Sequence, residues 1–455
     1  MTHSAKSAQS KQDNLFDRER IACLTRVVSK SILREEVDRR KLQKRSSRKC
    51  SAAVTVLFVV AMWFHGNDRY THVFRWLHRF LPAKMPSSSA LTQARARIGV
   101  GILAAVFHRV VGCLCNIQTP DSFYAGRRLV AVDGFVLNLA DSDANRQAFG
   151  RPKNGSSLGA YPQVRVVALC EVGSHAFFSF LAKPFSCGEP TMAQRVYKDL
   201  PENSLLLFDI NFCSYKLMKQ VIDQKSDFVG RSKVNRCLPQ RQILSDGSYL
   251  SKIYANDLDR SRDCNGQMIR VIEYTLDDPQ RVGHEEKHRL VTTLLDEKEH
   301  PSETLIMLYH ERWEEELAID EIKTHLRHAP KLRSHSPAGV IQEIYGLLLA
   351  HFVIRKIAVE AAALAGVSPR RISFVGTINV LRVCLVEAPR SPRQQKIWYQ
   401  NLIIEISLQL VEPRRNRTNP RVIKKQQSKW SKKREKHRKT QPLKLPFRDA
   451  IRILT

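Results

Sequence analysis

The stretch RRLVAVDGFVLNLAD, from Arg127 to Asp141, decides the fold class of this chain. It alternates along its length and is rich in valine and leucine, as expected of a β-strand. Two more strand-like runs follow it, VRVVALCEV at 164–172 and AFFSFLAKPF at 176–185, with a Gly-Ser turn signal between them. The sequence therefore predicts three successive strands in this region.

The next segment adds a buried strand between two helices. A short helical stretch begins near Met192, and a second helix begins at Ser214. Between them, SLLLFDI at 204–210 is nearly all apolar, which is typical of a strand buried on both faces. Three strands, a helix, a strand and a helix form the opening order of an RNase H-like fold, which is an α/β layer architecture.

Upstream of these strands, to about Asn116, the pattern is helical. The segment SALTQARARIGVGILAAVFHRVVGCL has apolar residues at helical spacing, and Ser89 is its expected N-cap. The apolar run from Ala52 to Phe64 is shorter than the roughly 18 residues that a membrane helix needs. It is therefore predicted to be a buried core helix. No signal peptide is visible, so we expect a cytoplasmic protein without a membrane partner.

Downstream of the buried strand, a β-rich insertion precedes two long helices. Residues 228–301 are polar and strand-prone and contain many turn signals, which predicts the insertion. A strong helix is expected over about 304–326. The second helix is marked by Ser336 as N-cap, Pro337 at its first position and Gly366 after its end.

The charge of the chain points to a polyanionic partner. The 74 Lys and Arg against 44 Asp and Glu give a formal net charge of +30, which destabilises a compact monomer by self-repulsion. The stretch Pro413 to Lys439 carries 13 Lys or Arg and one Glu, so it accounts for +12 and leaves +18 elsewhere. Nucleic acid is the first candidate partner and an anionic membrane surface the second.

The ten cysteines do not suggest a metal or disulfide framework. Only Cys113 and Cys115 lie close together, and no second Cys/His pair is found at zinc-finger spacing. Reduced, buried thiols are therefore the expected state of these residues.

Three carboxylates interrupt otherwise apolar elements. Asp133 lies inside the strand VAVDGFV, Asp209 near the end of LLLFDI, and Glu316 on the helix at 304–326. A lone Asp in a strand is more often structural than catalytic, but ligands of α/β sheets bind beyond the carboxyl ends of strands. Hard oxygen ligands on neighbouring elements can hold two Mg²⁺ ions for phosphodiester cleavage.

Four residues of the helix that carries Glu316 fall on one narrow stripe. Tyr309, Arg312, Glu316 and Lys323 lie within roughly 60° of arc on an ideal helix. A salt-bridged helix face explains this pattern as well as a functional site does, because Arg312 and Glu316 are an i,i+4 pair.

These residues also carry a family resemblance that covers most of the chain. Tyr309, Arg312, Glu316 and Lys323 match in full the signature of Tyr, two residues, Arg, three residues, Glu, six residues and Lys. That signature, in LYHERWEEELAIDEIKTHL, resembles the DDE transposases of the insertion-sequence-four family, which have an RNase H-like core interrupted by a β-insertion. Further resembling stretches are VAVDGFVLNLADSDANRQAFG, LLLFDINFCSYKLMKQV, FVGRSK at 228–233, SSSALTQARARIG and RRNRTNPRVIKK.

The resemblance implies a role for each motif residue. Asp133, Asp209 and Glu316 would be the catalytic carboxylates and ligate two Mg²⁺ ions, which Mn²⁺ can replace. Tyr309, Arg312 and Lys323 would grip DNA phosphates, and Arg231 and Lys233 of FVGRSK would bind DNA with them. The implied activity is cut-and-paste transposition: cleavage at the ends of an insertion sequence, often through a hairpin, and strand transfer. The implied partners are the terminal inverted repeats, the target DNA and a second copy of the chain in a synaptic complex. The implied location is the bacterial cytoplasm, at the nucleoid.

The motifs depart from the family pattern in small ways. Many relatives have a hydroxyl residue after Asp-Gly, where this chain has Phe135, and Arg after the second Asp, where it has Ile210. Asp141 and Asn145 fall in the first motif and are expected to be structural.

The better-known relatives stack a flipped end base on a Trp of the insertion. This chain has no Trp between Asp209 and Arg312. Either Tyr249, Tyr254 or Tyr274 takes that role, or the base is held in a different way.

The expected domains follow from these elements: a helical N-terminal DNA-binding domain at 1–120, the RNase H-like core at 121–227 and 304–400, the β-rich insertion at 228–303, and a basic, loosely ordered C-terminal tail at 401–455. Two alternatives keep this fold, namely an RNase H-like nuclease without strand transfer and a degenerate transposase that only binds DNA. A third is a basic nucleic-acid-binding protein that is not an enzyme, which would bind in a salt-dependent way without metal.

Overall fold

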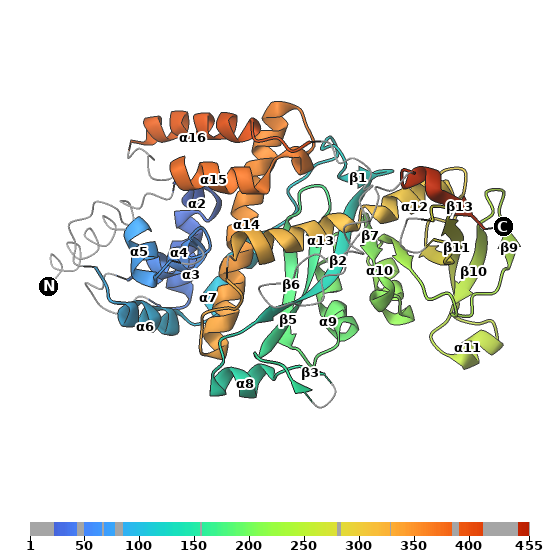
Figure 1. Ribbon diagram of the computed structural model, residues 1–455, viewed down its shortest axis with the longest axis horizontal. Helices are drawn as coiled ribbons and strands as arrows, with labels where there is room; N and C mark the ends of the chain where they lie inside the picture. Colours follow the sequence, from blue (N-terminus) through green and yellow to red (C-terminus); the bar gives the residue numbers. More distant parts are fainter. Residues whose placement is uncertain are drawn as a thin grey trace, which may run out of the picture. The chain divides into compact units, whose positions relative to one another are not determined.

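The protein is described by a computed structural model, in which residues 22–42, 50–65, 68–77, 85–154, 157–279, 284–327, 329–384, 391–412 and 445–454 are placed. It is a mixed α/β protein, as predicted (Figure 1). The chain forms two compact units: the first comprises residues 1–199 and 314–411, and the second residues 200–313 and 412–455.

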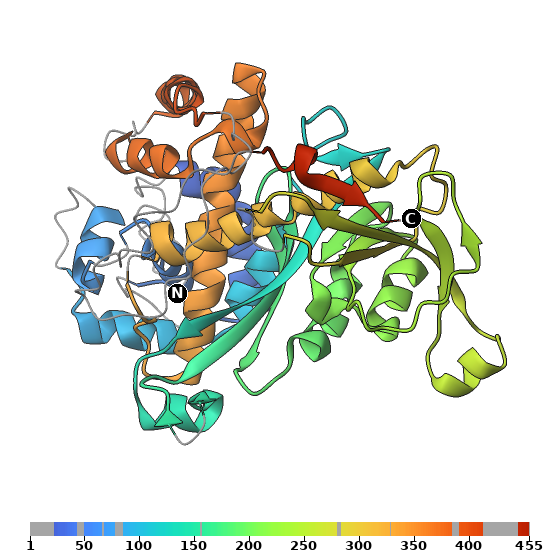
Figure 2. The ribbon, with the colours of Figure 1, turned by 45° about the vertical axis from the view of Figure 1, so that its right-hand side comes forward.

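The first unit contains the three predicted strands. They are β2 (Arg127–Asn138), β5 (Gln163–Glu171) and β6 (Phe177–Pro184), paired antiparallel in the order β6-β5-β2, with the short β1 (Phe123–Tyr124) on β2 (Figure 2). Smaller elements follow them in the chain: α8 (Asp143–Phe149), β3 (Lys153–Asn154), β4 (Ser157–Leu158), α9 (Glu189–Val196) and the 3₁₀ turn η1 (Tyr197–Asp199).

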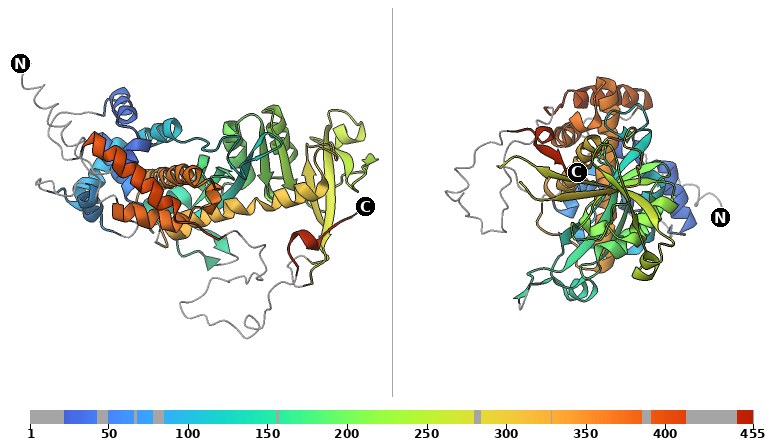
Figure 3. Two further views of the ribbon diagram at one scale, coloured as in Figure 1. Left: turned by 90° about the horizontal axis from the view of Figure 1, so that it is seen from above. Right: turned by 90° about the vertical axis from the view of Figure 1, so that its right-hand side faces the viewer.

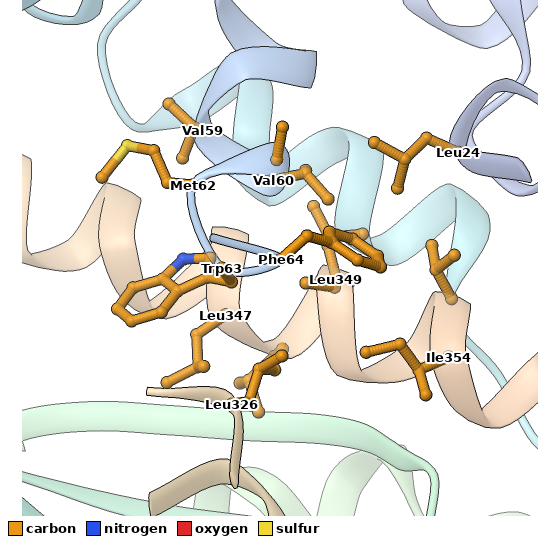
Figure 4. Close-up of a cluster of buried hydrophobic side chains, with 14 of the residues drawn as sticks. Leu24, Val59, Val60, Met62, Trp63, Phe64, Leu326, Leu347, Leu349 and Ile354 are labelled. Atoms are coloured by element: carbon orange, nitrogen blue, oxygen red, sulfur yellow. The ribbon is translucent and has the colours of Figure 1, made fainter. Parts of the chain in front are cut away.

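One hydrophobic core joins the N-terminal helices of the first unit to its C-terminal helices. The N-terminal helices are α2 (Ala22–Val27), α3 (Lys30–Arg39), α4 (Ala52–Ala61), α5 (Tyr70–Leu77), α6 (Ser88–Ile98) and α7 (Gly101–Val110). The C-terminal helices are α14 (Pro337–Ala365), the 3₁₀ turn η4 (Pro369–Arg371), α15 (Phe374–Cys384) and α16 (Pro392–Ser407), with α15 and α16 against α14 (Figure 3). The apolar helix α4 is buried, as predicted, and Figure 4 shows its C-terminal residues facing α14.

The predicted ends of α14 are confirmed, but the prediction for α6 and α7 was wrong in two details. Ser336 caps α14 through the amide of Gly339, and Gly366 follows its end with the left-handed φ of 64°. Upstream, the N-cap of α6 is Ser87 and not Ser89, because the Ser87 hydroxyl accepts from the amide of Ala90. The expected single helix also breaks at Gly99, whose φ of 67° a helix does not tolerate.

No single helix among the placed residues is long and apolar enough to span a membrane. Together, α6 and α7 meet the criteria of length and composition, with a bend of 72° at their break.

A buried histidine in α14 makes the stability of the first unit depend on pH. His351 is fully buried between Phe177 and Phe374, and burial lowers its pKa to about 3. An unfolded histidine titrates near 6.5, so below that pH the unfolded chain takes up a proton that the folded chain does not. Stability should therefore fall as the pH drops from 6.5, by up to about 1.4 kcal/mol per pH unit.

We expect His351→Gln to remove that part of the pH dependence, because glutamine does not titrate. Urea unfolding at pH 7.5, 6 and 5 would measure it: the stability gap between wild type and variant should narrow as the pH falls. Parallel losses of stability in both proteins would contradict the prediction.

The second unit is built on a mixed sheet. β7 (Ser204–Phe208) pairs parallel with β8 (Asp227–Arg231), and α10 (Tyr215–Asp223) connects them. The sheet continues antiparallel through the insertion in the order β8, β12 (His288–Thr292), β11 (Gln267–Leu276), β10 (Tyr249–Ile253) and β9 (Gln242–Ile243). The short helix α11 (Asp257–Ser261) lies between β10 and β11 in the chain. Residues 228–301 are therefore rich in β-strands, as predicted.

The helix expected at 304–326 forms three pieces and not one. α12 (Ser302–His310) ends in a turn at Glu311 and Arg312, and α13 (Trp313–Asp320) follows it. The last piece, η3 (Glu321–Leu326), is a π-helix, in which the amide of Arg327 donates to the carbonyl of Ile322 over 3.1 Å. The stretch contains neither glycine nor proline, so no local residue signals these breaks.

The expected tail is partly regular structure. Helix α16 extends into it to Ser407, and β13 (Ile451–Ile453) pairs antiparallel with β11 of the second unit. A 3₁₀ turn, η6 (Arg448–Ala450), leads into β13. Tyr274 of β11 pairs with His288 of β12 on one side and with Ile453 of β13 on the other. β13 therefore lies on the same side of β11 as β10, beyond the residues of β11 that β10 pairs with. The basic stretch from Pro413 to Lys439 lies outside the placed residues.

The terminal segment should contribute strongly to the stability of the second unit. Phe447 is 8% exposed and stacks on His310 of α12, with ring centroids 4.2 Å apart. We expect Phe447→Ala to destabilise this unit by about 3 kcal/mol, the usual cost of deleting a buried aromatic ring. Hydrogen exchange of the β11 and α12 amides would measure the effect.

Arg452→Ala is the matched control, because Arg452 lies in the same terminal segment, on β13, but its side chain is exposed and makes a surface ion pair with Asp277. Its β11 and α12 amides should exchange at close to the wild-type rate. Equal effects of the two substitutions would contradict a stabilising role for the Phe447 ring.

Candidate functional site

The first carboxylate, Asp133, is half-buried on β2. Its Oδ1 accepts from the amide of Gly134 over 2.7 Å, which fixes the orientation of the carboxylate. A Cβ added at Gly134 would lie 2.7 Å from the carboxylate of Glu189, so no larger residue fits there without displacing Glu189. Since successive side chains of a strand point to opposite faces, Glu189 lies on the face of β2 opposite Asp133.

The second carboxylate, Asp209, follows β7 directly and caps the 3₁₀ turn η2 (Ile210–Phe212), because its Oδ1 accepts from the amide of Ile210 over 2.7 Å. The ring of Phe208 packs over Gly230 of β8 so closely that a Cβ there would lie 1.9 Å from it. β7 and β8 are parallel, so their carboxyl ends meet at one edge of the sheet. Asp209 and Arg231 are therefore at the same edge.

Tyr309, at the end of α12, lies close enough to Asp209 and Arg231 to interact with their charges. Burial raises its pKa, and the neighbouring guanidinium groups of Arg312 and Arg231 oppose that shift. The carboxylate of Asp209 acts with burial to raise it. The second unit thus brings one carboxylate, one phenol and two arginines of the predicted site together.

Two aromatic residues of the insertion border this group. Tyr274 and His288 are directly opposite each other on β11 and β12, with ring centroids 5.1 Å apart. Arg231 Nη2 lies 3.4 Å from Nδ1 of His288. The hydroxyl of Tyr274 interacts with that of Tyr309. His288 was not predicted as a site residue, since only the register of the two strands reveals its position.

Of the three tyrosines proposed for base stacking, only Tyr274 is at this group. Burial raises the pKa of Tyr274 to about 12. The hydroxyl of Tyr254 donates to Oδ1 of Asp263 over 2.5 Å, and that of Tyr249 interacts with Glu273. The hydroxyls of Tyr254 and Tyr249 therefore contact acidic residues within the same β-rich region.

The third carboxylate and the signature lysine belong to the first unit. Glu316 is half-buried on α13, and Lys323 is half-buried on the π-helix η3. Burial lowers the pKa of Lys323, as does the nearby Arg327, while the carboxylates of Asp320 and Asp133 oppose that shift. Lys323 therefore lies close enough to Asp133 for their charges to interact.

The remaining residues of the motifs fall into two groups. Arg312 is 9% exposed, with its guanidinium 5.9 Å from the centroid of the Trp313 ring, and Lys233 is exposed after β8. Asp141 pairs with two arginines, and the side-chain amide of the buried Asn145 donates to two backbone carbonyls, so both make structural contacts as expected.

The carboxylates suit a hard divalent cation, because they are oxygen donors held in place by backbone amides or a helix. The placed part of the chain contains no assembled group of three His, Cys, Asp or Glu side chains with metal-site geometry.

Comparison with known proteins adds independent information. A family described as "Transposase DDE domain" matches residues 124–353, and one described as "Insertion element 4 transposase N-terminal" matches residues 18–108. The chain is 26% identical over 391 residues to transposase InsG for insertion sequence element IS4 of Escherichia coli (strain K12), covering 84% of this chain and 87% of InsG. It is 30% identical over 131 residues to the putative transposase InsZ of the same strain, covering 29% of this chain and 44% of InsZ. Among solved structures, a piggyBac transposase synaptic complex with hairpin DNA matches with a TM-score of 0.44 and 14% identity, over 85% of both chains.

Proposed function

The chain belongs to the DDE transposase family, and from this premise we propose that it cuts DNA at the ends of its insertion sequence and transfers the strands to a target by a cut-and-paste route. The observation that supports this most is the grouping of Asp209 with Tyr309, Arg231 and Arg312. A carboxylate beside phosphate-binding cations is the arrangement that phosphodiester chemistry requires.

In this proposal Asp133, Asp209 and Glu316 are the catalytic residues and hold two Mg²⁺ ions, which Mn²⁺ can replace. The ions would polarise the attacking oxygen and stabilise the leaving oxygen. The chain's own contribution is to aim the carboxylates: backbone amides hold Asp133 and Asp209, and α13 carries Glu316.

The cations of the site would hold the DNA. A guanidinium can bind two phosphate oxygens at once, so we assign Arg312 and Arg231 to phosphates at the element's end. Tyr309 would donate its hydroxyl to the same strand, since a tyrosine is protonated at neutral pH and burial raises the pKa of this one further. Lys323 beside Asp133, and the exposed Lys233, would add further phosphate contacts.

We extend the proposal to the whole chain. An RNase H-like core would be formed by residues 121–227 and 304–400, and residues 1–120 would bind DNA. The basic residues of 401–455 would contact DNA as well, which fits the net charge of +30. A homodimer bridging two terminal inverted repeats would act in the cytoplasm, at the nucleoid.

A single reaction tests the proposed function. Linear DNA carrying both ends of the element that encodes the chain is incubated with a supercoiled target plasmid, in Mg²⁺, in Mn²⁺ and in EDTA. We expect nicks at the element's ends and joined products in either metal, and neither in EDTA.

The same reaction separates the alternatives. Cleavage without any joined product would favour an RNase H-like nuclease. Salt-dependent binding without cleavage in either metal would favour a degenerate or purely DNA-binding protein.

A further inference from the structure

A cluster of buried charged and polar side chains lies against α13 and η3 in the first unit. Glu321 is at its centre: its Oε1 lies 2.9 Å from Nδ1 of His175, and its Oε2 accepts from Nε of Arg355 over 2.8 Å and from Nε2 of His351 over 2.9 Å. Nε2 of His175 lies 2.8 Å from the carboxylate of Glu314. We call these five residues the Glu321 cluster.

Stability alone does not account for the Glu321 cluster. The Glu321 and Arg355 side chains are 8% and 3% exposed, and His351 is fully buried. Taking such ions out of water costs free energy that their pairing often fails to return, and apolar residues of similar volume stabilise as well or better. Because apolar residues could stabilise the fold equally well, the buried ion pair points to another role, which is to position neighbouring groups.

The Glu321 cluster contacts α13 on the face opposite the Glu316 side chain. Glu314 precedes Glu316 by two residues and Glu321 follows it by five, so at about 100° per residue they lie about 160° and 140° from it around the helix. Contacts on that side limit the rotation of α13 about its own axis. The direction of the Glu316 carboxylate depends on that rotation.

The partner of both glutamates is itself rigidly held. His175 lies in the turn between β5 and β6, with a left-handed φ of 61° that costs free energy in any residue other than glycine. Its amide donates to the carbonyl of Glu171 over 2.8 Å, and its side chain is 2% exposed. The cluster therefore ties α13 to the same antiparallel sheet that carries Asp133 on β2.

Glu321 is also the residue at which the helix widens into the π-turn η3. Such turns are rare and occur often at functional sites. Leu326, at the other end of η3, is buried in the core near Leu347 (Figure 4). Between these two anchors lies Lys323, whose charge interacts with Asp133.

We infer that Glu321, held by Arg355, His351 and His175, is a positioning residue that sets the direction of the Glu316 carboxylate and the placement of Lys323. The inference rests on the proposed role of Glu316 as a metal ligand. In this inference Glu321 contacts neither metal nor DNA. It acts by fixing the rotation of α13 and the start of the π-turn.

The test is Glu321→Gln, which keeps the shape of the side chain and removes the charge that pairs with Arg355. We expect the Mg²⁺ concentration for half-maximal end cleavage to rise about tenfold or more, as for other residues that orient metal ligands. Binding of end DNA in EDTA should weaken only by the contact of Lys323, because Tyr309, Arg231 and Arg312 belong to the second unit. With Fe²⁺ in place of Mg²⁺, and with hydrogen peroxide and ascorbate added, oxidative cleavage of the protein backbone near Glu316 should weaken or move.

Glu343→Gln is the matched control. Glu343 is fully buried, lies 3.6 Å from Nη1 of Arg95 and accepts from the amide of Arg333 over 2.9 Å. These partners lie on α6 and in the loop before α14, and not on α13. Glu343→Gln should lower the unfolding temperature as Glu321→Gln does and leave the Mg²⁺ requirement unchanged. If both variants lose stability alike and both keep the wild-type Mg²⁺ requirement and Fe²⁺ cleavage pattern, the inference is overturned.

Two further variants complete the design. Should Glu321→Gln fail to fold, the double variant Glu321→Gln, Arg355→Met leaves no unpaired buried arginine and is expected to show the same Mg²⁺ shift. Glu316→Ala separates the two proposals: metal-dependent cleavage that survives it would overturn the role of Glu316 itself. Loss of cleavage in Glu316→Ala with a normal Mg²⁺ requirement in Glu321→Gln would overturn only the positioning role.

Discussion

Glu316→Ala is expected to lower metal-dependent cleavage at the element's ends by at least about 10³-fold. Loss of one of three carboxylate ligands removes several kcal/mol of stabilisation from the charge that develops in the transition state, and each 1.4 kcal/mol is about a tenfold change in rate. Binding of end DNA should persist, because Tyr309, Arg231 and Arg312 belong to the other unit and stay in place.

Single-turnover cleavage of labelled end DNA in Mg²⁺, with a binding assay in EDTA, would measure both quantities. Glu405→Gln is the matched control, since Glu405 is an exposed carboxylate of the first unit that lies on α16. It should cleave within a few-fold of wild type. Cleavage by Glu316→Ala within tenfold of wild type would remove Glu316 from the metal site.

The order of the elements could be predicted because each strand and helix carries its own local signal. The buried strand β7 is an unbroken apolar run, and α14 has a serine cap, an N-terminal proline and a following glycine in the chain itself. The break after α6 could also have been found, since Gly99 is visible in the sequence, but the apolar spacing continues across it and favours one helix.

The features that were missed depend on contacts distant in sequence. β13 follows a strongly basic stretch, and its pairing joins Ile453 to Tyr274, some 180 residues earlier. Glu314 and Glu321 have the sequence pattern of ordinary acidic residues on a solvated helix face, and only tertiary packing buries them against His175 and Arg355.

The sequence predicts a set of site residues, but it does not predict that these residues belong to two structural units. The signature at Tyr309, Arg312, Glu316 and Lys323 predicts one stripe of a continuous helix. In the structure the chain passes from the second unit to the first between Trp313 and Glu314, so the first two residues accompany Asp209 and the last two accompany Asp133. Spacing along the chain therefore predicts the residues of the site, while the turn and the π-helix determine which residues lie beside them.

Because Arg312 belongs to the second unit with Asp209, its loss should affect DNA binding. Arg312→Ala is expected to weaken binding to end DNA in EDTA by about 10- to 100-fold, the value of one or two charge-assisted hydrogen bonds to phosphate. The slope of log K against log salt should become shallower by about one unit for each phosphate that the variant no longer binds. Arg312→Lys should recover only part of the affinity, because an ammonium cannot bind two phosphate oxygens as a planar guanidinium does.

Lys225→Ala is the matched control for Arg312→Ala. Lys225 is also a cation of the second unit, but it precedes β8, and β7 and β8 run parallel, so it lies at the sheet edge opposite Asp209 and Arg231. Its removal should change affinity by less than about twofold at 0.15 M salt, where surface charges beyond about 8 Å are screened. If Lys225→Ala and Arg312→Ala weaken binding equally, DNA binding depends on the net charge of the chain. It would then not depend on specific contacts with the group around Tyr309. A large loss of affinity in Arg312→Ala alone would place an end phosphate at that group, beside Asp209.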